Sequence, residues 1–221
     1  MMSVLDKLTV AYLYTEGLDN YDWQQDFLMD FFRSPWTPVM FPGIEGNLSE
    51  ARYLAYAQIT TPYVVMLDPD DRVKWTALQQ CVEFLESNPD IGACGVSENA
   101  ITPRNQIMPT HYPTPFSMER FLITPLELHT CTVMRTEQVM EVLNDIRTVG
   151  FYNVDWALRL CIAHRYGAHK LPVIGYSFRR KENSHHTGAF QTEQTVPWFK
   201  TVSKLRELGL LPQPPEETGE T

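Results

Sequence analysis

Three carboxylates follow a short apolar run in the first third of the chain. The run at 63–67 ends in Asp68, Pro69, Asp70 and Asp71. Carboxylates this close repel one another unless a cation joins them, and Mg²⁺ and Mn²⁺ prefer oxygen ligands. Asp and Pro are also common in solvated turns that cap the following helix. The sequence therefore predicts either a divalent-cation site or an ordinary acidic turn at this position.

The elements that position these carboxylates are predicted from hydrophobic periodicity. In the first half of the chain strands alternate with helices, which favours a largely parallel, three-layer α/β sheet. Such sheets bind ligands at the carboxyl ends of their strands, which is where the acidic cluster stands. Strands are predicted at 8–14, 39–41, 63–67 and 91–96, and helices at 23–32, from 47–49 onward, and at 74–87.

The second half of the chain is less regular. Residues 97–115 contain four prolines and are predicted to form a long functional loop or lid. We expect one domain over residues 1–208, followed by a disordered, Pro- and Glu-rich tail at 209–221. Beyond the loop, strands are predicted at 129–134 and 171–178, and helices at 137–146, 155–166 and 196–208.

The composition excludes several classes of protein. The net charge of −9 argues against broad, non-specific nucleic-acid binding, which depends on Lys and Arg. No stretch approaches the roughly 20 apolar residues of a membrane span, and the N-terminus lacks the features of a signal peptide, so a cytoplasmic location is expected. The four cysteines form no C-x-x-C spacing and are predicted to be reduced and buried.

Four segments carry motif-like residues in a defined order. They read EARY at 50–53, VVMLDPDD at 64–71, FLESNPDIG at 84–92 and VDWALRL at 154–160. Their order and spacing resembles the GT-A-fold glycosyltransferases of the large inverting family 2, over residues 8–186. The resemblance implies a GT-A-like three-layer sandwich with a mostly parallel central sheet. It also implies transfer of a sugar from a nucleotide-diphosphate sugar to an acceptor hydroxyl.

The resemblance further implies roles for the acidic residues. Asp68 and Asp70 would hold the Mn²⁺ or Mg²⁺ that bridges the donor diphosphate, and Asp71 would help to position the metal or sugar. Asp155 would be the base that deprotonates the acceptor hydroxyl, a poor nucleophile at neutral pH. An Asp directly before a helix is also a common N-cap, so the sequence leaves both roles open for Asp155.

Other positions are expected to contact the donor. The resemblance places Arg52 near it, although Arg52 could equally be an exposed helix residue paired with Glu45 or Glu50. Thr15 follows the first strand, where the family binds the nucleotide. The basic stretch around Arg180 has anions as natural partners. One of two adjacent histidines, His185 or His186, would supply a further contact to the metal or the diphosphate.

The chain also departs from the family pattern. The family's acidic turn after its second strand is replaced by PGIEG at 42–46. An alternative is therefore a non-catalytic nucleotide- or carbohydrate-binding module on a degenerate GT-A scaffold. A sugar nucleotidyltransferase is disfavoured, because no Gly-rich loop follows the first strand. A saccharide is the foremost acceptor, and a hydroxymethylated DNA base stays open if a small basic surface forms from Lys170 and residues 179–181.

Overall fold

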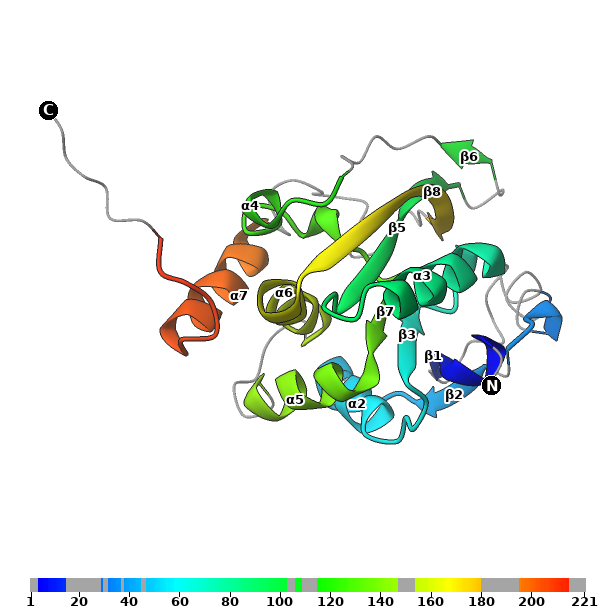
Figure 1. Cartoon of the computed structure of the whole chain (residues 1–221), viewed down its shortest axis with the longest axis horizontal. Coiled ribbons are helices and arrows are strands. Elements are labelled where there is room, and N and C mark those ends of the chain that lie inside the picture. Colours follow the sequence, from blue (N-terminus) through cyan, green and yellow to red (C-terminus); the bar gives the residue numbers. More distant parts are fainter. Residues whose placement is uncertain are drawn as a thin grey trace, which may run out of the picture.

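The computed structural model describes residues 4–14, 29, 32–36, 38–44, 47–102, 106–108, 115–146, 154–179 and 195–214. Figure 1 shows the arrangement of its helices and strands. In chain order these are η1 (Val4–Lys7), β1 (Leu8–Tyr14), β2 (Val39–Pro42), α2 (Leu48–Tyr56), β3 (Tyr63–Leu67), β4 (Arg72–Val73), α3 (Trp75–Ser87), β5 (Ala93–Ile101), β6 (Ile107–Met108), α4 (Met118–Phe121), η3 (Pro125–Glu127), β7 (Thr132–Arg135), α5 (Thr136–Ile146), α6 (Val154–Tyr166), β8 (Ala168–Arg179) and α7 (Thr195–Glu207).

The strands form one sheet in the order β2-β1-β3-β7-β5-β8-β4, with β6 paired to β5. β1 runs parallel to both β2 and β3, and β5 runs parallel to β8. β7 lies between these two parallel groups and is antiparallel to β3 and to β5. The predicted α/β class with a mostly parallel sheet is confirmed, and β7 is the strand that joins its two halves.

The sheet has a hydrophobic core on each face. All five residues of β3 are buried, and successive side chains of a strand point to opposite faces. Val64 and Met66 pack in the cluster that contains α5, α6 and α7, whereas Val65 and Leu67 pack with α3. α3 buries Leu78, Cys81, Val82 and Leu85, the spacing of one apolar helix face. These two cores make the predicted three layers.

The sheet is strongly curled. Four strand spacings separate β3 from β4, which is about 19 Å in a flat sheet. The chain nevertheless connects these strands through residues 68–71 alone, and the Asp71 N–H donates to the Asp68 carbonyl at 3.2 Å. A turn of this kind brings its first and last Cα atoms within about 7 Å. The link is too short for a flat sheet, so the carboxyl ends of β3 and β8 must curl toward one another.

The structure differs from the sequence expectations in two segments. The predicted loop begins at 97, whereas β5 continues to Ile101 and pairs with β8 along its length. The polar residues at 97–99 interrupt the apolar pattern that predicts a strand. The structure nevertheless buries Glu98 inside the sheet. The packed chain also extends past 208, since Leu211 is buried and the Gln213 side chain donates to the Arg206 carbonyl at 3.0 Å.

The predicted burial of the cysteines is confirmed, and a glycine forms the turn between α6 and β8. All four cysteines are free and buried, as predicted. Gly167 has a φ of 72°, the left-handed conformation that ends α6 and allows β8 to start immediately.

Of the helix predicted at 23–32, most residues lie outside the described part of the chain. No helix among the described residues has the length and apolar character needed to span a membrane.

Candidate functional site

Arg52 is the central residue of a polar cluster at the carboxyl end of β3. Its Nη2 atom lies 3.1 Å from Oδ1 of Asp68, and its Nη1 atom forms an ion pair with Oδ2 of Asp155. Thr130 adds a longer hydrogen bond to the other Asp68 oxygen, at 3.4 Å. One guanidinium therefore holds together two carboxylates that are far apart in the sequence.

Arg52 reaches this position from α2. Asn47 caps that helix, because its side chain accepts from the Glu50 N–H at 3.1 Å. Arg52 then falls on the face of α2 that packs against the sheet, and only 6% of the residue is exposed. The expectation of an exposed residue paired with neighbouring glutamates is therefore wrong, because burial directs the side chain to Asp68 and Asp155.

Asp155 lies in the first turn of α6. The helix begins at Val154, so Asp155 is inside the helix and the N-cap alternative is wrong. A carboxylate in the first turn interacts favourably with the helix dipole. Asp155 is 2% exposed, and its buried charge is matched by that of Arg52. Asp68 differs in this respect, because 40% of its side chain is exposed.

Asp71 connects the acidic turn to β8. The Tyr176 hydroxyl donates to one of its carboxylate oxygens, and the Arg179 backbone N–H donates to the other at 2.6 Å. Burial and the neighbouring Asp70 and Asp68 raise the pKa of Asp71 well above its usual range. Arg179 also donates from Nε to the Asp70 carbonyl at 2.8 Å. With both oxygens engaged, Asp71 fixes the backbone of the turn.

Asp68 and Asp70, the other two acidic residues of the turn, have carboxylate oxygens that suit a hard cation. No group of three or more His, Cys, Asp or Glu side chains that could hold a metal occurs in the described part of the chain. Mg²⁺ at nucleotide sites, however, commonly takes one or two carboxylates together with phosphate oxygens. Asp68 and Asp70 provide such carboxylates, so these residues fit a cation that binds together with a diphosphate.

Some of the predicted donor or metal contacts fall on residues that the structure does not describe. Thr15, Arg180 and His185 lie outside the described residues, as does His186. The predicted residues that the structure does bring together are Arg52, Asp68 and Asp155, with Asp70 in the same turn as Asp68.

His129 packs against Tyr176, the residue whose hydroxyl donates to Asp71. Its ring stacks on Tyr176, with centroids 5.2 Å apart. Its Nδ1 atom accepts from the Cys131 N–H at 3.1 Å, so the proton is on Nε2, which donates to the Val96 carbonyl at 2.7 Å. The Glu98 oxygen 3.5 Å from Nδ1 therefore faces a neutral ring. Burial, with Lys170 nearby, lowers the pKa of His129 to about 3.

This neutral histidine predicts a loss of stability in mild acid. Below about pH 6.5 the unfolded chain binds a proton at His129 that the folded chain does not bind until about pH 3. The free energy of unfolding should fall by up to about 1.4 kcal/mol per pH unit through this one group. Urea titrations between pH 7 and pH 4.5 measure the slope.

The variant His129→Gln isolates this contribution, because glutamine has no titrating group. Its pH slope should be smaller than that of the wild type. The matched control is His164→Gln, at an exposed position on α6, and this variant should keep the wild-type slope. Equal slopes for His129→Gln and the wild type would contradict the assignment of a neutral, buried ring.

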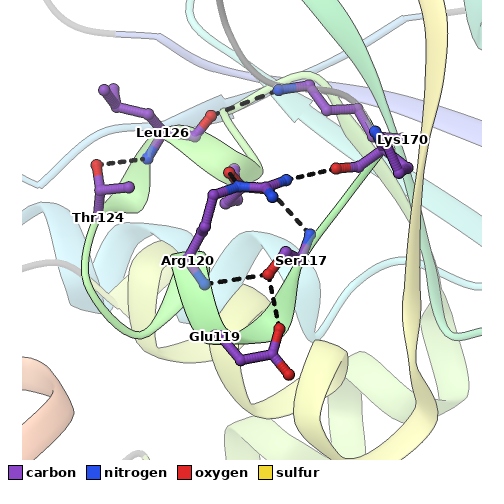
Figure 2. Close-up of polar contacts among 8 residues, drawn as sticks. Ser117, Glu119, Arg120, Thr124, Leu126 and Lys170 are labelled. Atoms are coloured by element: carbon purple, nitrogen blue, oxygen red, sulfur yellow. Dashed lines mark hydrogen bonds and ion pairs between the residues drawn. The ribbon is translucent and has the colours of Figure 1, made fainter.

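A second polar network includes two buried charged residues, Glu127 and Lys170, and part of it is shown in Figure 2. Glu127 is fully buried and accepts from Arg120 Nε at 2.7 Å and from the Ser117 N–H at 3.0 Å. Lys170 is 1% exposed and its Nζ donates to the Leu126 carbonyl at 3.5 Å. Lys170 thus belongs to the interior of the protein.

This burial corrects the expected basic surface for a DNA acceptor. Lys170 is held inside the network of Figure 2, and Arg179, 6% exposed, is engaged with the acidic turn. Neither side chain is available to a phosphate backbone at the surface. The other two residues of the expected surface, Arg180 and Lys181, lie outside the described residues.

Sequence reasoning missed Arg159. It lies on α6, four residues after Asp155, so the two residues share a helix face. It is 5% exposed, and its charge is close enough to Tyr56, Arg52 and Asp68 to interact with them. An arginine at helical spacing from a candidate site residue, between two leucines of a buried face, was the signal that could have identified it.

The comparisons with known proteins concern the family and the fold. Residues 36–142 match the family model described as Glycosyl transferase family 2. That segment contains Arg52 and the acidic turn, while α6 with Asp155 lies beyond it. No curated protein is similar enough in sequence to count as a match.

Solved structures of S. aureus TarS 1-349 share the fold. One TarS 1-349 structure has a TM-score of 0.52 and 15% identity, over 78% of this chain and 60% of that chain. The complex with UDP has a TM-score of 0.57 and 14% identity, over 79% and 61%. The complex with UDP-GlcNAc has a TM-score of 0.53 and 12% identity, over 89% and 65%.

These likenesses establish the fold and the extent of the match. The chain spans about 60–65% of the length of these TarS structures. The scaffold is GT-A-like, as the order of its motifs predicted. The resemblance of this chain to glycosyl transferase family 2 is thereby confirmed, through a family match over residues 36–142 on a GT-A-like fold.

Proposed function

We propose that this protein is a metal-dependent glycosyltransferase, which moves a sugar from a nucleoside-diphosphate sugar to an acceptor hydroxyl with inversion at the sugar carbon. The observation that carries the proposal is the Arg52 side chain, which joins Asp68 to Asp155 within the family-2 scaffold. The TarS structures that share the fold were solved with UDP and with UDP-GlcNAc, which supports a UDP-sugar as the first donor to test.

The two groups of carboxylates would divide the chemistry between them. Asp68 and Asp70 would hold Mn²⁺ or Mg²⁺, which when bound neutralises charge on the leaving diphosphate. Asp155 would accept the proton of the acceptor hydroxyl as that oxygen attacks the sugar carbon. Inversion requires the hydroxyl and the diphosphate on opposite faces of the sugar. A base on α6 and a metal site at the end of β3 come from separate elements, which suits this requirement.

Asp155 needs its ion pair to act in this way. Arg52 fixes the orientation of the carboxylate and compensates its charge in a buried position. When a diphosphate binds, the same guanidinium has a second anion to contact, because arginine donates readily to phosphate oxygens. Such sharing would weaken the hold of Arg52 on Asp155 and make the carboxylate a better base once the donor is present.

Metal removal is the direct test of the proposed reaction. The protein is incubated with a panel of nucleotide sugars, UDP-GlcNAc first, with Mn²⁺ and a panel of saccharide acceptors, and release of the nucleoside diphosphate is measured. We expect release to require Mn²⁺ or Mg²⁺, to stop with EDTA and to resume when the metal is restored. Absence of both donor binding and turnover, with and without EDTA, would contradict the proposal.

A non-catalytic binding module is the second candidate. The observation that favours it is the burial of Asp155, which is 2% exposed and paired with Arg52. Donor binding without transfer to any acceptor across a wide panel would support this alternative. The acceptor panel should include hydroxymethylated DNA analysed by mass spectrometry. We expect a saccharide to be modified in preference to DNA, because Lys170 and Arg179 are buried.

A further inference from the structure

Arg159 is a buried cation that forms no ion pair with the residues that the structure describes. The residue is 5% exposed, and its Nε atom is buried without a hydrogen-bond partner. Neither a hydrogen bond nor an ion pair joins it to any other residue that the structure describes, in contrast to Arg165 on the same helix, which pairs with Glu141 and Asp145. Asp155 is the nearest carboxylate in sequence on the same face of α6, and it forms its ion pair with Arg52.

An uncompensated buried guanidinium is unfavourable for a folded chain. Buried charges are normally paired or hydrogen-bonded, because the loss of solvation is otherwise not recovered. The surroundings of Arg159 show the same effect, since burial and the nearby charge of Arg52 lower the pKa of Arg159 to about 10. At that value the side chain still carries its charge at neutral pH. Arg52 and Arg159 are thus neighbouring cations, and of the two it is Arg52 that has carboxylate partners among the described residues.

Asp68 does not supply that anion. It interacts with Arg159 only through its charge, and its oxygens are used by Arg52 and Thr130. Tyr56 and Tyr176 are the other groups whose charge acts on Arg159, and both are neutral hydroxyls at neutral pH. Burial raises the pKa of each of these two tyrosines further. Among the described residues, no carboxylate is therefore in direct contact with Arg159, and Asp68 acts on it only at a distance.

We propose that Arg159 is a ligand of the diphosphate in the nucleotide donor, beside Arg52. This inference rests on the proposed function and adds a residue to it. A planar guanidinium with two parallel N–H donors matches a phosphate group and stabilises negative charge as the diphosphate leaves. Arg52 and Arg159, from two different helices, would then contact one anion.

The test compares three ligands and four proteins. Binding of UDP, inorganic pyrophosphate and uridine is measured by calorimetry in the presence of Mn²⁺, for the wild type, Arg159→Met and Arg159→Lys. Methionine keeps the apolar bulk and removes the charge, while lysine keeps the charge and removes the planar fork. The matched control is Arg165→Met, because Arg165 is on the same helix but has carboxylate partners away from the site.

We expect Arg159→Met to weaken binding of UDP and of pyrophosphate by about 10- to 100-fold, as for the loss of a charged hydrogen bond. Binding of uridine should be unchanged, and Arg159→Lys should lose less than Arg159→Met. The midpoint of thermal unfolding should stay the same or rise in Arg159→Met, because an unpaired buried charge has been removed. Arg165→Met should bind all three ligands as the wild type does.

Two results would overturn this inference alone. One is unchanged UDP and pyrophosphate affinity in Arg159→Met while the wild type binds both. The other is loss of the folded state in Arg159→Met, since the charge of Arg159 would then be needed to stabilise the folded protein. A wild type that binds neither UDP, nor pyrophosphate, nor any other nucleoside diphosphate would instead overturn the proposed function, and this inference with it.

Discussion

Replacement of Asp155 by asparagine is expected to lower kcat by about 10²- to 10⁴-fold, the contribution of a general base. Asparagine has nearly the shape of aspartate but cannot accept the acceptor proton. Arg52 would keep Asp68 as a partner, so the fold and the donor site should persist. The measurements are kcat under saturating donor and acceptor, and the dissociation constant of the donor by calorimetry, which should stay within about threefold of the wild type.

The matched control is Asp145→Asn. Asp145 is a partly exposed carboxylate on α5 that pairs with Arg165. Its replacement should leave both kcat and donor binding unchanged. Turnover of Asp155→Asn at the wild-type rate would remove Asp155 as the base. A fall in donor affinity that accounts for the whole loss of activity would give Asp155 a binding role instead.

Replacement of Arg52 by methionine is expected to destabilise the folded protein by about 3–5 kcal/mol. The variant leaves the Asp155 carboxylate buried without its cation, and uncompensated buried charges have costs of this size. The free energy of unfolding from urea titration is the direct measurement. A loss this large is a substantial fraction of the stability of an ordinary domain, so the variant should also unfold at a lower temperature.

A double variant separates the charge from the packing. Arg52→Met combined with Asp155→Asn contains neither charge and should recover much of the lost stability. The control Arg165→Met breaks ion pairs in which the partner carboxylates are partly exposed, and should cost less than about 1 kcal/mol. A loss below about 1 kcal/mol in Arg52→Met itself would contradict the description of Arg52 as the counterion of Asp155.

The local elements of this fold are predictable from the sequence because their signals are local. β3 occupies 63–67 as expected, since a short apolar run with β-branched residues ends at an Asp-Pro pair. α3 shows one apolar face at helical spacing and stops near Asn88-Pro89. Ser97, Glu98 and Asn99 break the apolar pattern of β5, and partners far along the chain bury Glu98 there.

The site was predictable in its residue types and not in its pairing. The spacing of Asp68 and Asp70 indicates a cation site or an acidic turn. The residues around the turn do not, however, reveal the hydrogen bonds that Asp71 accepts from Tyr176 and Arg179. Those contacts depend on the curl of the sheet, which places β8 beside the turn. Arg52 likewise pairs with Asp155 only because α2 and α6 pack in the same core cluster.

The short link at residues 68–71 makes the two halves of the sheet mechanically dependent. β1, β2 and β3 form one parallel group, and β5 and β8 form the other. A four-residue turn, anchored by Asp71 to β8, sets a maximum separation between the groups on their carboxyl side. A rotation about β7 that opens this side would stretch this link. Asp68 and Asp70 therefore lie on a segment whose length limits how far the sheet can open.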